Sequence, residues 1–254
     1  MTTLPSFTLT LAPSTRANER LPLSRMELFA GIPDRDLQLL DLRLPAVRWS
    51  RGEEAPELLT RPEHLYLVRE GRMALLERTG PGQKIMISLL DPGAIYSTLG
   101  NAGAPNASVL DDAAVTPLPG RVVEALITRY PRLGLNLAQL MSERVATLCE
   151  TVAMVSEMRV EDRLRARLHQ LADRFGVAAR DGVRLSLDLT HAQWASLIGA
   201  SREAVTTAFG KLRAQGIKID GRTITIPWDV VRRHEGITDE APTAAASELE
   251  MAVA

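Results

Sequence analysis

The sequence predicts an α+β fold in which short strands dominate the first half of the chain and helices the second. Short apolar segments separated by glycine and proline turns lie between residues 47 and 93. Apolar residues at heptad spacing follow Pro131, and two short helical patterns with a hairpin pattern lie between Thr190 and Ile226. The predicted parts are an arm at 1–24, a strand-rich domain at 25–130, a long helix at 131–158, a helical domain at 159–236 and an acidic tail at 237–254.

Composition favours an anionic partner for the helical domain. At 254 residues the chain is long enough for two modest domains, and its net charge is −1. Residues 160–236 hold 13 Lys and Arg against 9 Asp and Glu, a difference of +4, whereas residues 237–254 hold none against 4, a difference of −4. No apolar run is long enough to cross a membrane and the N-terminus lacks a signal-peptide core, so we expect a cytoplasmic protein without membrane contact.

The sequence predicts that the first domain is a β-barrel or jelly roll preceded by a flexible arm. Residues 1–24 are rich in Thr, Ser and Pro without periodicity, which is typical of a flexible segment. A helix is expected at Asp34–Leu44, where leucines recur at helical spacing. Strands are then expected around Val47–Trp49, Leu65–Val68, Met73–Glu77 and Ile85–Leu90, separated by turns that contain glycine or proline.

A long helix with a narrow apolar seam follows a short helix at Val122–Tyr130. Beyond Gly134 the seam alternates spacings of three and four: Ala138, Met141, Val145, Leu148, Val152 and Val155. Glu143, Arg144, Glu150 and Glu157 flank it. A narrow seam between charged flanks favours a two-stranded coiled coil over a helix buried in its own domain. We therefore expect a homodimer with Met141, Val145, Leu148, Val152 and Val155 at its interface.

The helical domain opens with an amphipathic helix at Val160–Phe175, so a hinge is expected near residues 158–162. A half-buried strand is expected where Val183, Leu185, Leu187 and Leu189 alternate with polar residues. Thr190 with Gln193 forms a capping-box pattern, which predicts a helix from His191. Gly199 should end that helix.

A second short helix and a hairpin complete this domain. Ser201 is a suitable N-cap, and Ala204, Val205, Ala208 and Leu212 should form the buried face before Gly216 ends the helix. Asp220-Gly221 is a strong turn signal between two short strands spanning 217–226, and a last helical piece reaches about Glu235. Helix, glycine turn, helix and hairpin in this order predict a winged helix-turn-helix rather than a plain helical hairpin.

This arrangement predicts binding to duplex DNA, because the first turns of the second helix fit the major groove. Arg202 can bind guanine O6 and N7, and Glu203 can accept from cytosine N4. Hydroxyl groups at helix N-termini and cations on the hairpin suit phosphates. The candidate DNA-binding residues are Thr190, Ser201, Arg202, Glu203, Thr206, Thr207, Lys211, Lys218 and Arg222.

Leu197-Ile198-Gly199 followed by Ser201–Val205 resembles the recognition-helix motif of the CRP/FNR superfamily of bacterial transcription regulators. The resemblance spans roughly residues 28–230. The Gly71-Arg72 step and the Leu90–Gly93 turn are similar to those of the cyclic-nucleotide-binding β-roll. The resemblance to this superfamily implies a homodimeric transcription regulator that acts on inverted-repeat operators and is not an enzyme. It also implies RNA polymerase as a protein partner.

The sequence departs from this family where cyclic nucleotides are bound. The receptors use a Gly-Glu-Leu stretch and an Arg-Ser or Arg-Thr pair, and these positions align here with Ser97–Leu99 and Asn106–Ser108. Neither the acid nor the base is present, which argues against cyclic AMP in the usual mode. The candidate effector-pocket residues are Thr98, Leu99, Asn106, Ser108, Leu148 and Cys149. On the DNA side, Thr207 stands where many members carry a second arginine.

Other chemistries find little support. The single cysteine excludes an internal disulfide or a four-cysteine cluster, and we expect Cys149 to be a buried apolar residue rather than a redox thiol. We expect no metal site and no haem ligation, since His64 reads as a surface residue and the other three histidines lie on separate elements. No cofactor or catalytic motif is indicated. Two alternatives stay open: a regulator with a non-nucleotide or atypically bound effector, and a dimeric sensor whose winged helix binds protein.

Overall fold

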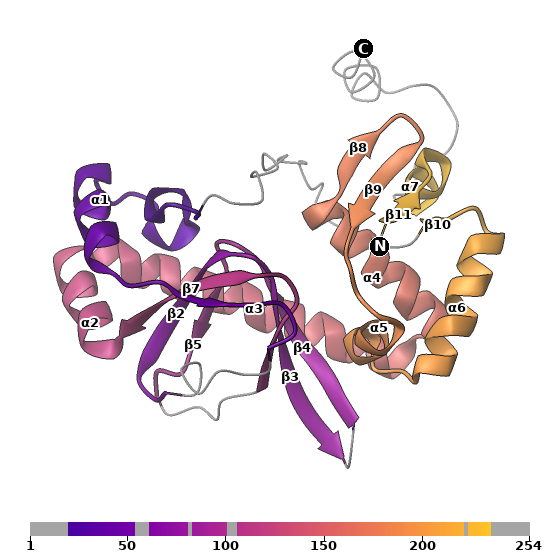
Figure 1. Ribbon diagram of the computed structural model, residues 1–254, viewed down its shortest axis with the longest axis horizontal. Coiled ribbons are helices and arrows are strands. Elements are labelled where there is room, and N and C mark those ends of the chain that lie inside the picture. The colour runs from indigo at the N-terminus through magenta and orange to yellow at the C-terminus, as the bar shows by residue number, and fades with distance from the viewer. Residues whose placement is uncertain (1–19, 54–60, 81–82, 101–105, 221–222, 235–254) are drawn as a thin grey trace, which may run out of the picture. The chain divides into compact units, whose positions relative to one another are not determined.

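The computed structural model describes residues 20–53, 61–80, 83–100, 106–220 and 223–234 (Figure 1). They fall into two compact units, one ending at Ser156 and the other beginning at Glu157. This division lies just before the predicted hinge at 158–162. In the part of the chain that the structure describes, no helix is long and apolar enough to cross a membrane.

The first unit is built from short helices, seven strands and a long helix among its described residues. Its helical elements are η1 (Leu23–Arg25), η2 (Glu27–Phe29), α1 (Asp34–Arg43), α2 (Gly120–Arg129) and α3 (Pro131–Glu157). Its strands are β1 (Val47–Trp49), β2 (His64–Glu70), β3 (Met73–Gly80), β4 (Gln83–Leu90), β5 (Ile95–Ser97), β6 (Asn106–Val109) and β7 (Ala113–Pro119).

Two antiparallel sheets confirm the predicted β-roll. One has the strand order β1-β7-β2-β5 and the other the order β4-β3-β6. Strand β2 is buried on both faces: Leu65 and Leu67 join the core under the helices, while Tyr66 and Val68 join the core of the roll. Because each face of β2 packs against one of these two buried clusters, its residues are apolar without alternation.

Strands β5, β6 and β7 were not predicted from the sequence. Pro117 and Pro119 obscure β7, because proline cannot donate to a sheet ladder. In the structure β1 pairs only with Ala113–Val115 of β7. Pro117 and Pro119 lie in the part of β7 that pairs with β2 but not with β1. No backbone N–H is therefore needed there for a hydrogen bond to β1.

The predicted arm boundary at residue 24 is too late. Leu23 is 1% exposed, and the Leu21 N–H donates to the Arg69 carbonyl at 2.9 Å. The apolar side chains of this segment therefore pack on the first unit from Leu21 onward. The rest of the predicted arm, residues 1–19, and the predicted tail at 237–254 lie outside the described residues.

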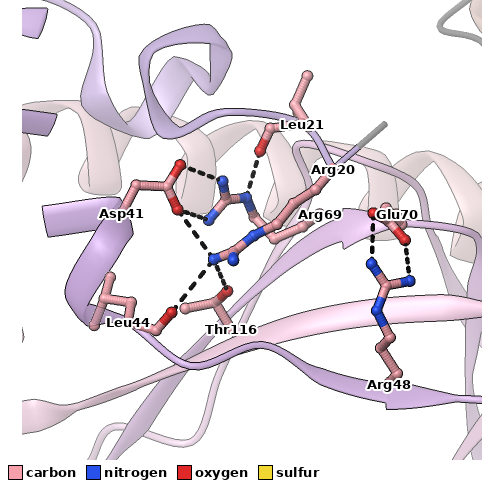
Figure 2. A network of polar contacts seen from close by, with 8 residues as sticks. All are labelled: Arg20, Leu21, Asp41, Leu44, Arg48, Arg69, Glu70 and Thr116. Atoms are coloured by element: carbon pink, nitrogen blue, oxygen red, sulfur yellow. Dashed lines mark hydrogen bonds and ion pairs between the residues drawn. The ribbon is translucent and has the colours of Figure 1, made fainter. Parts of the chain in front are cut away.

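A buried arginine fastens this segment to the roll (Figure 2). The register of β2 shifts between Val68 and Glu70, and the Arg69 side chain is fully buried. Its Nη1 and Nη2 donate to Asp41 at 3.1 and 2.8 Å, while its Nε donates to the Leu21 carbonyl at 2.5 Å. Arg20 approaches the same carboxylate at 3.0 Å. Burial alone would raise the pKa of Asp41, but hydrogen bonding to Arg69 and the two positive charges hold it below its ordinary value.

On α3, an apolar stripe is exposed in the chain by itself. Val145, Leu148, Val152 and Val155 are 59%, 39%, 66% and 42% exposed. Met141 packs partly against the core of its own unit, so the exposed stripe begins at Val145. Cys149 is exposed as well, so the expectation of a buried cysteine is wrong for the single chain.

The second unit contains α4 (Val160–Phe175), β8 (Val177–Ala179), β9 (Gly182–Ser186), α5 (His191–Ile198), α6 (Arg202–Ala214), β10 (Lys218–Asp220), β11 (Thr223–Ile226) and α7 (Trp228–His234). One antiparallel sheet has the order β10-β11-β9-β8. Strand β8 was not predicted, and β9 ends at Ser186 instead of continuing to Leu189. Leu187 is buried although it lies beyond the strand, so its alternation reflected burial and not pairing.

Candidate nucleic-acid interface

The turn between α5 and α6 is built as the sequence predicts. Gln193 N donates to Thr190 Oγ1 at 3.2 Å, and Thr190 N donates to Gln193 Oε1 at 2.8 Å, which completes the capping box. Gly199 ends α5 with φ of 62°, a left-handed conformation that glycine adopts without strain. Ser201 then caps α6 by accepting from the Ala204 N–H at 3.2 Å. These caps fix the point at which the second helix begins.

Helix α6 has one buried and one exposed face. Val205, Ala208, Phe209 and Leu212 are buried, whereas Ala204, expected among them, is half-buried. Phe209 was missing from the predicted face. The predicted outward residues are all exposed: Arg202, Glu203, Thr206, Thr207 and Lys211.

The two threonines of α6 turn their hydroxyl groups toward the helix backbone. Thr206 Oγ1 donates to the Arg202 carbonyl at 2.9 Å, and Thr207 Oγ1 donates to the Glu203 carbonyl at 3.1 Å. Because a hydroxyl has one hydrogen, neither side chain can also donate to a phosphate while these bonds hold. His191, which was not predicted as a site residue, contacts Thr206 Oγ1 through Nδ1 at 2.9 Å. The position of His191 directly after the N-cap Thr190 could have marked it as a site residue in the sequence.

Lys211 is tied to the first turn of α4. Its Nζ lies 3.2 Å from Glu161 Oε2, and Gln215 Nε2 donates to Glu161 Oε1 at 2.8 Å. Hydrogen bonds from Gln215 and Lys211 hold the pKa of Glu161 below its ordinary value. The second half of α6 is thereby linked to α4 by a charged network that the sequence analysis did not identify.

Lys218 also has a carboxylate partner. Its Nζ lies 2.9 Å from Asp181 Oδ2, and Arg184 lies 3.8 Å from the other oxygen of that group. The hydrogen bond from Lys218 lowers the pKa of Asp181. The remaining predicted cation of the hairpin, Arg222, lies outside the described residues.

The structure does not bring the predicted effector-pocket residues together as one polar group. Thr98 is 1% exposed, and its hydroxyl donates to the Arg61 carbonyl at 2.7 Å and accepts from His64 N at 3.1 Å. Leu99 packs against the core under the helices. Asn106 is exposed and Ser108 half-buried, both on β6 of the other sheet. Leu148 and Cys149 are exposed on α3.

An aromatic pair occupies the core of the roll. The rings of Tyr66 and Tyr96 stack with centroids 5.8 Å apart, and both side chains belong to the buried cluster of the roll. Burial raises the pKa of Tyr96 to about 12, so its hydroxyl stays neutral at physiological pH. Neither tyrosine was among the predicted site residues.

The second unit matches a known protein family, and most of the chain is similar to known regulators of transcription. The family described as "Crp-like helix-turn-helix domain" matches residues 162–227. A relative from Mycobacterium tuberculosis, named "CRP-like cAMP-activated global transcriptional regulator", is 23% identical over 80% of this chain and 93% of its own length. A "Global nitrogen regulator" from Synechocystis is 29% identical over 65% of this chain and 76% of its own length.

A solved structure shares the fold. A CooA mutant from Carboxydothermus hydrogenoformans matches with a TM-score of 0.66 at 19% identity, over 88% of this chain and 98% of its own. The helix-turn-helix match and the relatives named as regulators identify a DNA-binding transcription regulator. Residues 162–227 match the Crp-like helix-turn-helix family, and most of the chain is similar to CRP-type regulators of transcription.

Proposed function

We propose that this regulator acts as a homodimer on inverted-repeat operators and lacks the usual cyclic-AMP site. The observation that carries the dimer is the exposed stripe of Val145, Leu148, Val152 and Val155 on α3. Removing apolar surface from water stabilises by about 25 cal/mol per Å². A second copy of the same helix presents the same stripe at the same heptad spacing, so it can cover the first by two-fold symmetry.

In this proposal α6 reads bases and the surrounding groups position the protein. Arg202 and Glu203, exposed in the first turn, face base edges in the major groove. Thr190, Ser201 and Lys218 contact phosphates, together with Arg222. Lys211 and Lys218 each hold a carboxylate in the free protein, so phosphates compete with Glu161 and Asp181 for them.

The proposal excludes cyclic AMP in the usual mode, although the Mycobacterium tuberculosis relative is named as cAMP-activated. Thr98 stands at the place of the carboxylate, and its hydroxyl is taken up by backbone groups. Asn106 stands at the place of the arginine and brings no positive charge to a phosphate. An effector, if one acts here, is a non-nucleotide molecule or a nucleotide bound by other groups.

We further propose RNA polymerase as a protein partner and the cytoplasm as the location, since a regulator of transcription works where the genes are. The protein acts by binding and not by catalysis. The competing candidate, a sensor whose winged helix docks on protein, makes a different prediction for DNA. Titration of the full chain with duplex DNA at several salt concentrations distinguishes the two candidates. A DNA-binding regulator should bind duplex DNA with an affinity that falls steeply as the salt concentration rises, whereas a protein-docking sensor should not bind duplex DNA.

A further inference from the structure

We propose that His191 is a positioning residue for DNA reading: it holds Thr206 so that the methyl group of this threonine, and not its hydroxyl, faces the base edges. The inference rests on the proposed function, in which α6 enters the major groove. Its basis is the contact between His191 Nδ1 and Thr206 Oγ1, 2.9 Å long, which joins the first residue of α5 to the second turn of α6.

Counting hydrogens fixes the roles of the two side chains. Thr206 Oγ1 lies 2.9 Å from the Arg202 carbonyl, which can only accept, so the single hydroxyl hydrogen points there. We accordingly assign the ring hydrogen to His191 Nδ1, which then donates to Thr206 Oγ1. The hydroxyl of Thr206 is therefore engaged as donor and as acceptor inside the protein. Its γ-methyl is the end of the side chain left for DNA.

His191 is itself held by aromatic packing. Its ring stacks on Phe209 with centroids 5.4 Å apart at an interplanar angle of 22°. Phe209 and Trp194 form a T-shaped pair with ring centroids 5.6 Å apart at an interplanar angle of 84°, and the two residues are 3% and 2% exposed. Core packing thereby fixes the imidazole, and the imidazole fixes Thr206. A group locked in this way costs little further entropy when it meets DNA.

A methyl group on the exposed face of α6 matches the C5-methyl group of thymine, which is the apolar feature of the major groove. We therefore infer that Thr206 selects thymine at one position of each half-site. Thr207 serves as the matched control, because it makes the same backbone bond through its hydroxyl at 3.1 Å and is the next residue along the helix.

The test first selects an operator for the full chain from a random duplex library and then replaces each thymine in turn by uracil, which lacks the methyl group. At one position per half-site the wild-type protein should bind about fourfold more weakly, the effect of one buried methyl group. Thr206→Ser should not distinguish uracil from thymine there, whereas Thr207→Ser should. A wild-type protein indifferent to uracil at every position overturns the inference without any variant.

Two variants separate the hydrogen bond from the ring. His191→Phe keeps a ring for Phe209 but has no donor, and His191→Asn keeps an N–H near the place of Nδ1 but has no ring. We expect His191→Phe to lose the uracil discrimination and His191→Asn to keep it. A role in packing alone predicts the reverse order, and that result contradicts the inference. Arg202→Ala measured on the same DNAs reports the proposed function separately: if it loses operator preference while the uracil scan is flat, only the role of His191 fails.

Discussion

Arg69 and Asp41 form a two-pronged ion pair in which the arginine is completely buried and the carboxylate oxygens lie 3.1 and 2.8 Å from its Nη1 and Nη2. Removing one charge of a buried pair leaves the other without compensation. Asp41→Asn should therefore lower the free energy of unfolding by about 3–5 kcal/mol, measured by urea denaturation. Arg48→Ala is the control: its pair with Glu70 involves a side chain 68% exposed, and it should cost under about 1 kcal/mol.

The same pair predicts how stability depends on pH. The pKa of Asp41 is lower in the folded protein than in the unfolded chain, where an aspartate titrates at about 3.9. Its contribution is therefore present above the unfolded pKa and is lost as the pH falls through the folded pKa. Between pH 7 and 3, wild type should lose more unfolding free energy than Asp41→Asn. Parallel losses in the two proteins would show that this carboxyl is not the group responsible.

The sequence predicted this unit as a roll of strands but not the ion pair inside it. Arg69 follows an apolar run and reads as the end of a strand, and only the bulge in β2 turns its side chain toward Asp41, 28 residues earlier. The caps at Thr190, Gly199 and Ser201 were predictable because they depend on neighbours within four residues. The partners of Lys211 and Lys218 were not, since Glu161 and Asp181 approach them only in the tertiary structure.

On the dimer, the exposed stripe of α3 gives a direct prediction. Leu148→Asp would place two like charges opposite each other in a two-fold coiled coil, so the variant should sediment as a monomer and lose operator binding. Leu42→Asp is the matched control, because Leu42 is 85% exposed on α1, away from the stripe. A Leu148→Asp protein that remains dimeric and binds its operator would eliminate α3 as the interface.

On DNA, Arg202 and Lys218 should behave differently. Arg202→Ala should weaken operator binding by about 1–3 kcal/mol, relax preference at one base pair of each half-site and leave binding to scrambled DNA nearly intact. Lys218→Ala should weaken binding to both DNAs alike, and Asp181→Asn should strengthen both by releasing Lys218 from its 2.9 Å pair. The two half-sites should lie about 34–36 Å apart. Equal losses for Arg202→Ala on both DNAs would refute the assignment of α6 as the reader.

On the effector, calorimetry should detect no site for cyclic AMP at micromolar concentration, which corresponds to about −8 kcal/mol. The reason is that the two positions that would have to hold ribose and phosphate carry a buried Thr98 and an uncharged Asn106. One saturable site per chain in that range would contradict this, and a structure of the complex would then show which groups replace the missing pair.

Thr98 also bears on how such a site could arise or be lost along a mutational path. A glutamate at this position would bring a carboxylate to a place 1% exposed, where the Arg61 and His64 carbonyls lie 2.7 and 3.2 Å from the present hydroxyl. These two carbonyls would repel the carboxylate, with the His64 N–H, 3.1 Å from the present hydroxyl, as the donor near it, so the single change would destabilise the roll. An arginine at Asn106 alone would bring a positive charge for a phosphate but would leave the ribose without its carboxylate. A complete nucleotide site of the usual kind would therefore need changes at both positions, and the change at the buried Thr98 is the costlier of the two.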